Sequence, residues 1–189
     1  MTLTPINSGW IEAICGPMFS GKTEELIRRL IRAQIAQQKV AIFKPSSDNR
    51  YEEDYIVSHN QRKIKSIQVQ HTDIILKYRD KADVFGIDEV QFFNQSIVEV
   101  CRILANAGKR VVVAGLEKDY LANSFGPMPQ IIVDAEYITK VNAICIKCGD
   151  PANFSHRISG ETKQVVVGEI DKYEALCRRC YYNNNEVTK

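Results

Sequence analysis

The sequence predicts an α/β protein in which helices flank a mostly parallel sheet, followed by a small metal-binding ribbon. Three observations lead to this prediction. A glycine-rich motif stands between a strand pattern and a helix pattern, strand and helix patterns then alternate over the first two thirds of the chain, and two C-x₂-C pairs lie near its end. We therefore expect an α/β domain over residues 1–138 and a ribbon domain over residues 139–189.

The composition is that of an ordinary soluble protein with a sizeable core, since 44% of the 189 residues are apolar and 25% are charged. The formal net charge of +2 gives no strong attraction to nucleic acid or to an anionic membrane. Residues 1–5 lack the pattern of a secretion signal, and the longest apolar run, residues 111–116, is too short to span a bilayer. We expect a cytoplasmic protein that binds neither nucleic acid nor membrane.

The first strand is predicted at residues 10–15, a short apolar run that precedes the sequence Gly-Pro-Met-Phe-Ser-Gly-Lys-Thr. This octet has the G-x₄-G-K-T spacing of a phosphate-binding P-loop, in which glycines let the backbone curl so that its amides face phosphate oxygens. The lysine reaches the outer phosphates, and the threonine hydroxyl can hold Mg²⁺. A glycine turn that fits by accident is the alternative, but a full chance match is rare at ordinary glycine frequency. The predicted phosphate-binding residues are Gly16, Pro17, Met18, Phe19, Ser20, Gly21, Lys22 and Thr23.

A helix is predicted directly after this loop, because apolar residues then recur at helical spacing. The positive end of its dipole would strengthen phosphate binding. The apolar positions are Leu26, Ile27, Leu30, Ile31 and Ile35. The arginines between them, Arg28, Arg29 and Arg32, are interpreted as a solvated helix face.

Further strands are predicted at residues 40–43, 82–89 and 110–115, with a helix at residues 96–107. This alternation predicts a P-loop NTPase-like sheet, whose ligands lie at the carboxyl ends of the strands. Asp88 lies at such an end and suits a second Mg²⁺ anchor, while Glu89 could accept a proton from an attacking hydroxyl or water. The alternative is an acidic pair in a solvated loop.

Four of the six cysteines form two C-x₂-C pairs: Cys145 with Cys148, and Cys177 with Cys180. Together they can offer four thiolates to one tetrahedral Zn²⁺, which would be structural because no coordination position remains open. Disulfides are disfavoured in the cytoplasm, and a redox pair would not need a second copy. Cys15 and Cys101 stand in apolar settings and are interpreted as core residues.

Residues 163–173 lie between the two pairs, and composition does not separate a plain ribbon strand with a turn from a loop that covers a substrate. Arg157 is a minor candidate for a phosphate contact. Residues 183–189 are polar, and we expect them to be disordered.

With these motifs in this order, the chain resembles the type II thymidine kinases from about Gly9 to Tyr182. The resemblance rests on several short segments: residues 16–23, Lys44-Pro45 followed by residues 48–51, residues 88–93, Gly115-Leu116, residues 125–127, and residues 171–173 just before Cys177.

The resemblance implies transfer of the ATP γ-phosphate to the 5′-hydroxyl of thymidine, giving dTMP in nucleotide salvage. It implies Mg-ATP as donor, structural zinc and a homotetramer, and it makes Glu89 the catalytic base. The residues that it adds on the ATP and Mg²⁺ side are Asp48, Asn49, Arg50, Asp88 and Gln91. Those that it implies around the nucleoside are Met18, Gln91, Phe92, Leu116, Tyr120, Phe125, Ser155, Gln164, Val165, Val166, Val167, Gly168 and Tyr173.

Four positions depart from the family's pattern: Glu117 stands where Asp is usual, Glu169 replaces a glycine, Tyr120 replaces Phe and Ser155 replaces Thr. They bear on the pocket rather than on the phosphate chemistry. Oligomeric state, thymidine against deoxyuridine preference and feedback inhibition by dTTP do not follow from the residues themselves.

Two other functions fit the same motifs. One is a P-loop ATPase or switch whose zinc ribbon binds nucleic acid, with Glu89 activating water. The near-neutral charge and the lack of a basic stripe argue against it. The other is a kinase for a different small molecule, such as another nucleoside.

Overall fold

The computed structural model describes residues 8–46, 55–57, 63–158 and 172–186, and its largest feature is a six-stranded sheet. The strand order is β5-β2-β6-β7-β1-β8, and each neighbouring pair is parallel. The predicted mostly parallel α/β architecture is therefore confirmed. The strands are β1 (Trp10–Cys15), β2 (Val40–Pro45), β5 (Ile67–Val69), β6 (Val84–Ile87), β7 (Arg110–Gly115) and β8 (Tyr137–Lys140).

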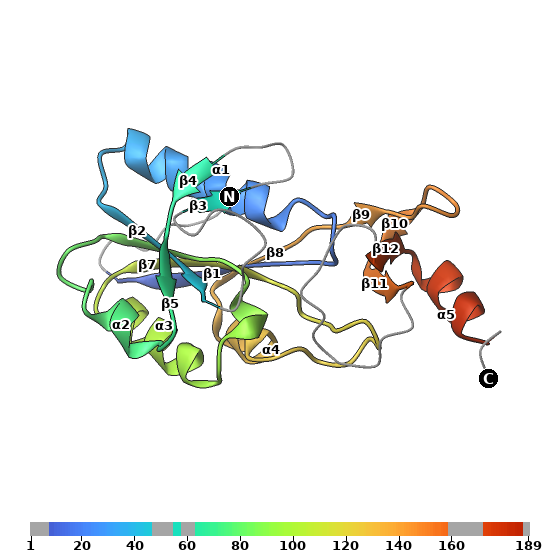
Figure 1. The fold of residues 1–189 in the computed structure, drawn as a ribbon. Coiled ribbons are helices and arrows are strands. Elements are labelled where there is room, and N and C mark those ends of the chain that lie inside the picture. Colours follow the sequence, from blue (N-terminus) through green and yellow to red (C-terminus); the bar gives the residue numbers. More distant parts are fainter. Residues whose placement is uncertain (1–7, 47–54, 58–62, 159–171, 187–189) are drawn as a thin grey trace.

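Helices cover both faces of this sheet (Figure 1). One face carries α1 (Lys22–Ile35) and the hairpin of β3 (Tyr55–Val57) and β4 (Lys63–Lys65). The other face carries three helices and a short 3₁₀ turn. These are α2 (Asp73–Leu76), η1 (Val90–Phe92), α3 (Ser96–Asn106) and α4 (Met128–Asp134). Each face has its own apolar core, because alternate residues of buried parallel strands point to opposite sides.

The burial pattern of α1 shows how the helix docks. Leu26, Ile27 and Leu30 are fully buried, whereas Ile35 at the end of the helix is 76% exposed. A glycine lets the helix approach closely, since a Cβ on Gly86 of β6 would lie 2.4 Å from Leu30 Cδ1. The predicted apolar stripe is therefore buried over its first turns.

The C-terminal part is built from two small antiparallel pairs and a helix, and it lies beyond the sheet end at which the loop after β1 stands (Figure 1). The predicted boundary at residues 138/139 falls within β8, and the two-domain division stays a prediction. The expected disorder from residue 183 is wrong for residues 183–186, which continue α5. The elements are β9 (Ala143–Ile144), β10 (Pro151–Ala152), β11 (Phe154–Arg157), β12 (Tyr173–Leu176) and α5 (Arg178–Glu186).

A buried ion network ties α1 to the sheet and corrects the prediction that Arg29 is solvated. Glu12 of β1 is 7% exposed and accepts hydrogen bonds from Arg29 Nη1 at 2.7 Å and Arg110 Nε at 2.6 Å. Arg29 also donates to Glu25 Oε1 and to Thr139 Oγ1 of β8. This arginine therefore joins β1, β8 and its own helix.

The arginines of this network lower the pKa values of the Glu12 and Glu25 carboxyls. Burial raises the pKa of Glu12, but hydrogen bonds from Arg110 and Trp10 and the charges of Arg110 and Arg29 outweigh it, so the pKa lies below its ordinary 4.5. The hydrogen bond from Arg28 is the main cause that lowers the pKa of Glu25, to about 2. Because both folded-state values are depressed, their contribution to stability is present above about pH 4.5 and is lost as the pH falls toward 2.

We expect Arg29→Met to lower the free energy of unfolding by about 1–3 kcal/mol at neutral pH, because Glu12 loses a partner in a site that excludes water. The matched control is Arg28→Met, whose side chain is 53% exposed and binds Glu25 at the surface; it should cost at most about 0.5 kcal/mol. Urea unfolding of both variants measures the difference, which should shrink below about pH 4.5 as Glu12 takes up a proton. Equal losses in the two variants at neutral pH would contradict this role of Arg29.

Among the helices that the structure describes, none combines the length and apolar character needed to cross a membrane.

Candidate functional site

The glycine-rich loop of residues 16–23 joins the carboxyl end of β1 to the start of α1, as the motif requires. Gly16 has φ +152°, and a Cβ there would lie 2.2 Å from the Val141 carbonyl oxygen, so a side chain does not fit. Gly21 has φ +82° and precedes the helix. Lys22 Nζ and Ser20 Oγ each donate to the Pro17 carbonyl at 2.7 Å. The loop thus curls over its own lysine at a helix N-terminus, an arrangement that suits phosphate.

The two carboxylates after β6 take different environments. Asp88 is 5% exposed, and its Oδ1 accepts from Thr23 Oγ1 at 3.4 Å and from the Glu89 amide at 3.0 Å. A hydroxyl and a carboxylate side by side are oxygen donors of the kind that Mg²⁺ prefers, so these residues fit that ion.

Glu89 has a strained backbone, with φ 51° and ψ 41°. A left-handed conformation in a residue other than glycine costs on the order of 1–3 kcal/mol and is often found at functional sites. Its side chain accepts a hydrogen bond from Gln91 Nε2, and Gln91 Oε1 in turn accepts from the Leu116 amide at 2.9 Å. Gln91, which is 3% exposed, therefore links the Glu89 carboxylate to the chain leaving β7.

Two glycines enclose Gln91, and sequence reasoning did not show their role. A Cβ on Gly115 would lie 2.7 Å from Gln91 Oε1, and one on Gly126 would lie 2.3 Å from the Gln91 carbonyl oxygen. In the sequence, residues 125–127 contribute only to the family resemblance. Because Gly126 and Gln91 are far apart in the sequence, the sequence alone does not predict this contact.

We expect Gly126→Ala to lower stability and kcat together, because the new Cβ must displace the Gln91 backbone. The matched control is Gly108→Ala. Gly108 has φ +79° against +54° for Gly126, but nothing lies within 4 Å of its Cβ position. Both variants incur about 1–2 kcal/mol for left-handed backbone, and Gly126→Ala should lose about 1–3 kcal/mol more from overpacking. Thermal unfolding and steady-state kinetics measure this, and equal behaviour of the two would refute the contact.

The predicted nucleoside residues fall into two connected groups. In the main body, which is the part built around the six-stranded sheet, the Phe92 and Phe125 rings pack edge to face beside the Gln91–Leu116 link. Their ring centroids lie 5.8 Å apart. In the ribbon, Ser155 Oγ accepts from the Met18 amide at 2.9 Å, which connects β11 directly to the glycine-rich loop.

Arg157 of β11 lies against Tyr120 and Tyr173, so the second group also reaches the loop of residues 116–126. Eight predicted site residues lie outside the described residues, as does Glu169. The eight are Asp48, Asn49, Arg50, Gln164, Val165, Val166, Val167 and Gly168.

Glu117, one of the four departures noted above, turns toward the end of β8. Its Oε1 lies 3.1 Å from Lys140 Nζ and 3.9 Å from Lys118 Nζ, and the side chain is 11% exposed. The longer side chain therefore forms ion pairs at the junction between the sheet and the ribbon.

The four paired cysteines meet at one place, with all four Sγ atoms within 4.8 Å of one another. Four sulfurs this close together fit a tetrahedral zinc ion. Cys15 and Cys101 are buried away from this cluster, as expected for core residues.

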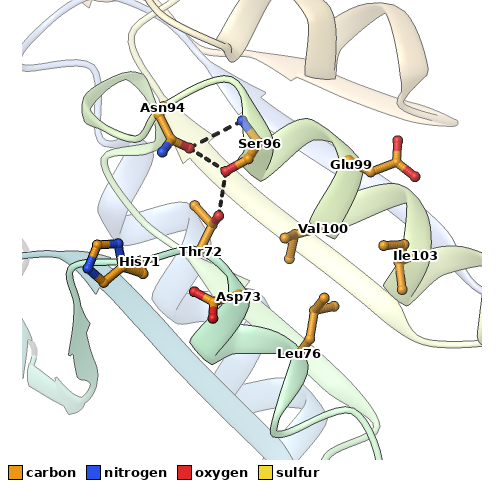
Figure 2. A pocket seen from close by; sticks show the side chains of 9 residues that line it. All are labelled: His71, Thr72, Asp73, Leu76, Asn94, Ser96, Glu99, Val100 and Ile103. Carbon is orange, nitrogen blue, oxygen red and sulfur yellow. Dashed lines mark hydrogen bonds between the residues drawn. The ribbon is translucent and has the colours of Figure 1, made fainter.

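A separate hollow lies between α2 and α3, and no predicted site residue lines it. Figure 2 shows Thr72, Asn94 and Ser96 joined by hydrogen bonds at its upper rim, including Thr72 Oγ1 to Ser96 Oγ at 2.5 Å. The polar side chains at this rim therefore already form hydrogen bonds with one another. The lining residues are His71, Thr72, Asp73, Leu76, Asn94, Ser96, Glu99, Val100 and Ile103.

Comparison with known proteins gives one consistent result. The family model described as thymidine kinase matches residues 9–181. A thymidine kinase of Rhodothermus sp. (strain ITI 518) is 56% identical over 173 residues, covering 92% of this chain and 81% of the relative. Thymidine kinases of Bacteroides thetaiotaomicron and Porphyromonas gingivalis are 54% and 51% identical, covering 92% and 93% of this chain and 87% and 86% of the relatives.

Proposed function

The chain belongs to the thymidine kinase family and is a phosphotransferase, and we propose that it transfers the γ-phosphate of ATP to the 5′-hydroxyl of thymidine, giving dTMP. The observation that carries this proposal is the Glu89–Gln91–Leu116 link beside the Thr23–Asp88 pair. It puts a candidate base next to a candidate site for the donor phosphates.

On the donor side, backbone N–H groups of the loop (Pro17 has none) and the Lys22 ammonium would hold the β- and γ-phosphates of ATP. Lys22 Nζ, which donates to the Pro17 carbonyl in this structure, would exchange that oxygen for a phosphate oxygen. Thr23 and Asp88 would hold Mg²⁺, which neutralises negative charge on the phosphates. Asp48, Asn49, Arg50 and Gln91 complete this side on the strength of the resemblance, and Arg50 would add charge near the transferred group.

On the acceptor side, Glu89 accepts the proton of the 5′-hydroxyl as that oxygen attacks the γ-phosphorus. The bond from the γ-phosphorus to the oxygen bridging it to the β-phosphorus breaks, and ADP leaves with that electron pair. The hydrogen bond from Gln91 orients the Glu89 carboxylate for this step. Positioning and charge neutralisation supply most of the catalysis in such a reaction.

The thymine base would lie between the two groups of predicted pocket residues. Phe92, Leu116, Tyr120 and Phe125 would contribute from the main body, and Ser155 and Tyr173 would contribute from the ribbon. Residues 164–168 would wrap the nucleoside, as the resemblance implies. The zinc ion would be structural, because four cysteine ligands leave no open coordination position for chemistry. It would hold the ribbon together.

The protein would work in the cytoplasm as a homotetramer, with thymidine and ATP as its ligands and no role for nucleic acid or membrane. The gathering of four cysteine sulfurs supports this proposal, because zinc ligands of this kind must be reduced thiolates.

The test is to supply Mg-ATP and follow ADP release with thymidine, deoxyuridine, deoxycytidine, deoxyguanosine or single-stranded DNA as the second reactant. We expect rapid ADP release with thymidine and recovery of dTMP in equal amount. Stimulation by DNA alone would favour an ATPase, and stimulation by another nucleoside alone would favour a different kinase.

A further inference from the structure

Arg157 is a buried arginine that the proposed reaction does not yet use. It ends β11, pairs with Tyr173 of β12 in the strand register and is 7% exposed. Burying a charged guanidinium costs free energy unless strong local contacts replace its contacts with water. Its contacts therefore indicate what the residue does.

The first partner lies in the ribbon. Arg157 Nη2 and Nε donate to the Tyr173 hydroxyl at 2.6 and 3.1 Å, so two arms of the guanidinium hold one phenol oxygen. Tyr173 is the first residue of β12 and follows closely on the segment that includes residues 164–168. The arginine thus fixes the tyrosine at the start of β12.

The second partner lies in the main body. The guanidinium carbon is 3.7 Å from the centre of the Tyr120 ring, a close cation–π contact. The Tyr120 carbonyl in turn accepts from the Tyr181 hydroxyl of α5 at 2.7 Å. Tyr120 belongs to the loop after β7 that also carries Leu116 and Phe125, so Arg157 joins this loop to the ribbon.

The chemistry is specific to arginine. A flat guanidinium can stack on one ring with its face while its edge donates two hydrogen bonds to another residue, and a lysine ammonium cannot do both. Two of its nitrogens, Nε and Nη2, already donate to Tyr173 in this structure, which supports a positioning role.

We infer that Arg157 is a positioning residue that locks Tyr120 and Tyr173 into one arrangement and thereby sets the affinity for the nucleoside, but not for ATP. This inference rests on the proposed function, because it assumes that the two tyrosines line the nucleoside pocket. It assigns to Arg157 the coupling between the ribbon and the loop after β7.

The experiment compares Arg157→Lys with the wild-type, zinc-loaded protein. Lysine keeps the charge and much of the length, yet loses the stack and the double hydrogen bond. We expect KM for thymidine to rise about tenfold while KM for ATP stays within about twofold. Calorimetric titration of thymidine without ATP should show the same loss. The control is Arg102→Lys in α3, because the Arg102 side chain is 43% exposed and pairs with Asp134 outside the proposed pocket; both KM values should stay unchanged.

A double-mutant cycle tests whether Arg157 acts through Tyr173. Tyr173→Phe removes the acceptor oxygen and should reproduce the split between the two KM values. Adding Tyr173→Phe to Arg157→Lys should raise KM for thymidine by less than about twofold further, because the shared contact is already lost. If Arg157→Lys does not fold, Arg157→Gln, which keeps N–H donors but loses the charge and the stack, is tested for the same split between the two KM values.

The outcomes separate the two proposals. A wild-type protein that neither binds nor phosphorylates thymidine overturns the proposed function and this inference with it. Wild-type activity with unchanged thymidine affinity in the variants overturns only the inference. A rise in KM for ATP at constant KM for thymidine also overturns it, because Arg157 would then act on the phosphates.

Discussion

Glu89→Gln is expected to lower kcat for thymidine phosphorylation by ~10²–10⁴ while ATP affinity stays nearly intact. Glutamine has the shape of glutamate and can still accept a hydrogen bond from Gln91, but it cannot take the proton of the 5′-hydroxyl. Most of the residues proposed for ATP binding lie at positions 16–23, where β1 leads into α1, so removing this charge leaves most donor contacts in place. Rapid-quench kinetics with saturating thymidine would measure the chemical step directly.

The matched control is Glu99→Gln in α3, whose side chain is 64% exposed and lies on the helix that follows the same loop. It removes the same charge without entering the site, and kcat should not change. A Glu89→Gln enzyme with wild-type kcat would remove Glu89 from the role of base. A kcat that is normal but accompanied by lost ATP binding would instead assign Glu89 to the donor side.

Cys148→Ser is expected to release zinc, unfold the ribbon and abolish thymidine binding. Zinc content should fall from about one ion per chain to near zero, because a structural site with one thiolate missing binds the metal far more weakly. The ribbon core is small and includes Cys145 and Cys177 themselves, so little else holds it together. Native mass spectrometry and calorimetric titration with thymidine measure both losses.

ATP binding provides the internal check on this variant, since the glycine-rich loop and Asp88 belong to the larger sheet. Cys101→Ala is the control: this cysteine is fully buried among apolar residues, and burial raises its pKa to about 12. It should lose stability but keep its zinc. Full activity in zinc-free Cys148→Ser would end the structural-zinc proposal.

The four central strands of the sheet were predictable because their signals are local, whereas the edge strands β5 and β8 were not predicted. Each buried strand is a short apolar run, and the motif at residues 16–23 fixes a strand before it and a helix after it. Asp88 and Glu89 could be located for the same reason, since they follow directly on β6. The four cysteines could be grouped because thiolate pairs at this spacing have few other uses.

Contacts between distant segments could not be predicted. Arg29 occupies a position that helical periodicity makes polar, and only the fold shows that Glu12 of β1 lies beneath it. The packing of Gly126 against Gln91 and the position of Arg157 between two tyrosines are of the same kind. The roles assigned to residues 48–50 and 164–168 stay predictions.

The seam between the glycine-rich loop and the chain leaving β8 affects how the protein could be cut into fragments. The Val141 amide donates to the Cys15 carbonyl at 2.8 Å, and Gly16 has no room for a side chain beneath the Val141 carbonyl. A chain that ends at residue 138 would lose this contact with Val141 and would leave Ile14 and Cys15 of β1 without their β8 partners, Thr139 and Lys140. A fragment meant to bind ATP on its own should therefore retain the chain through residue 141. A hinge between the sheet and the ribbon would have to lie beyond that residue.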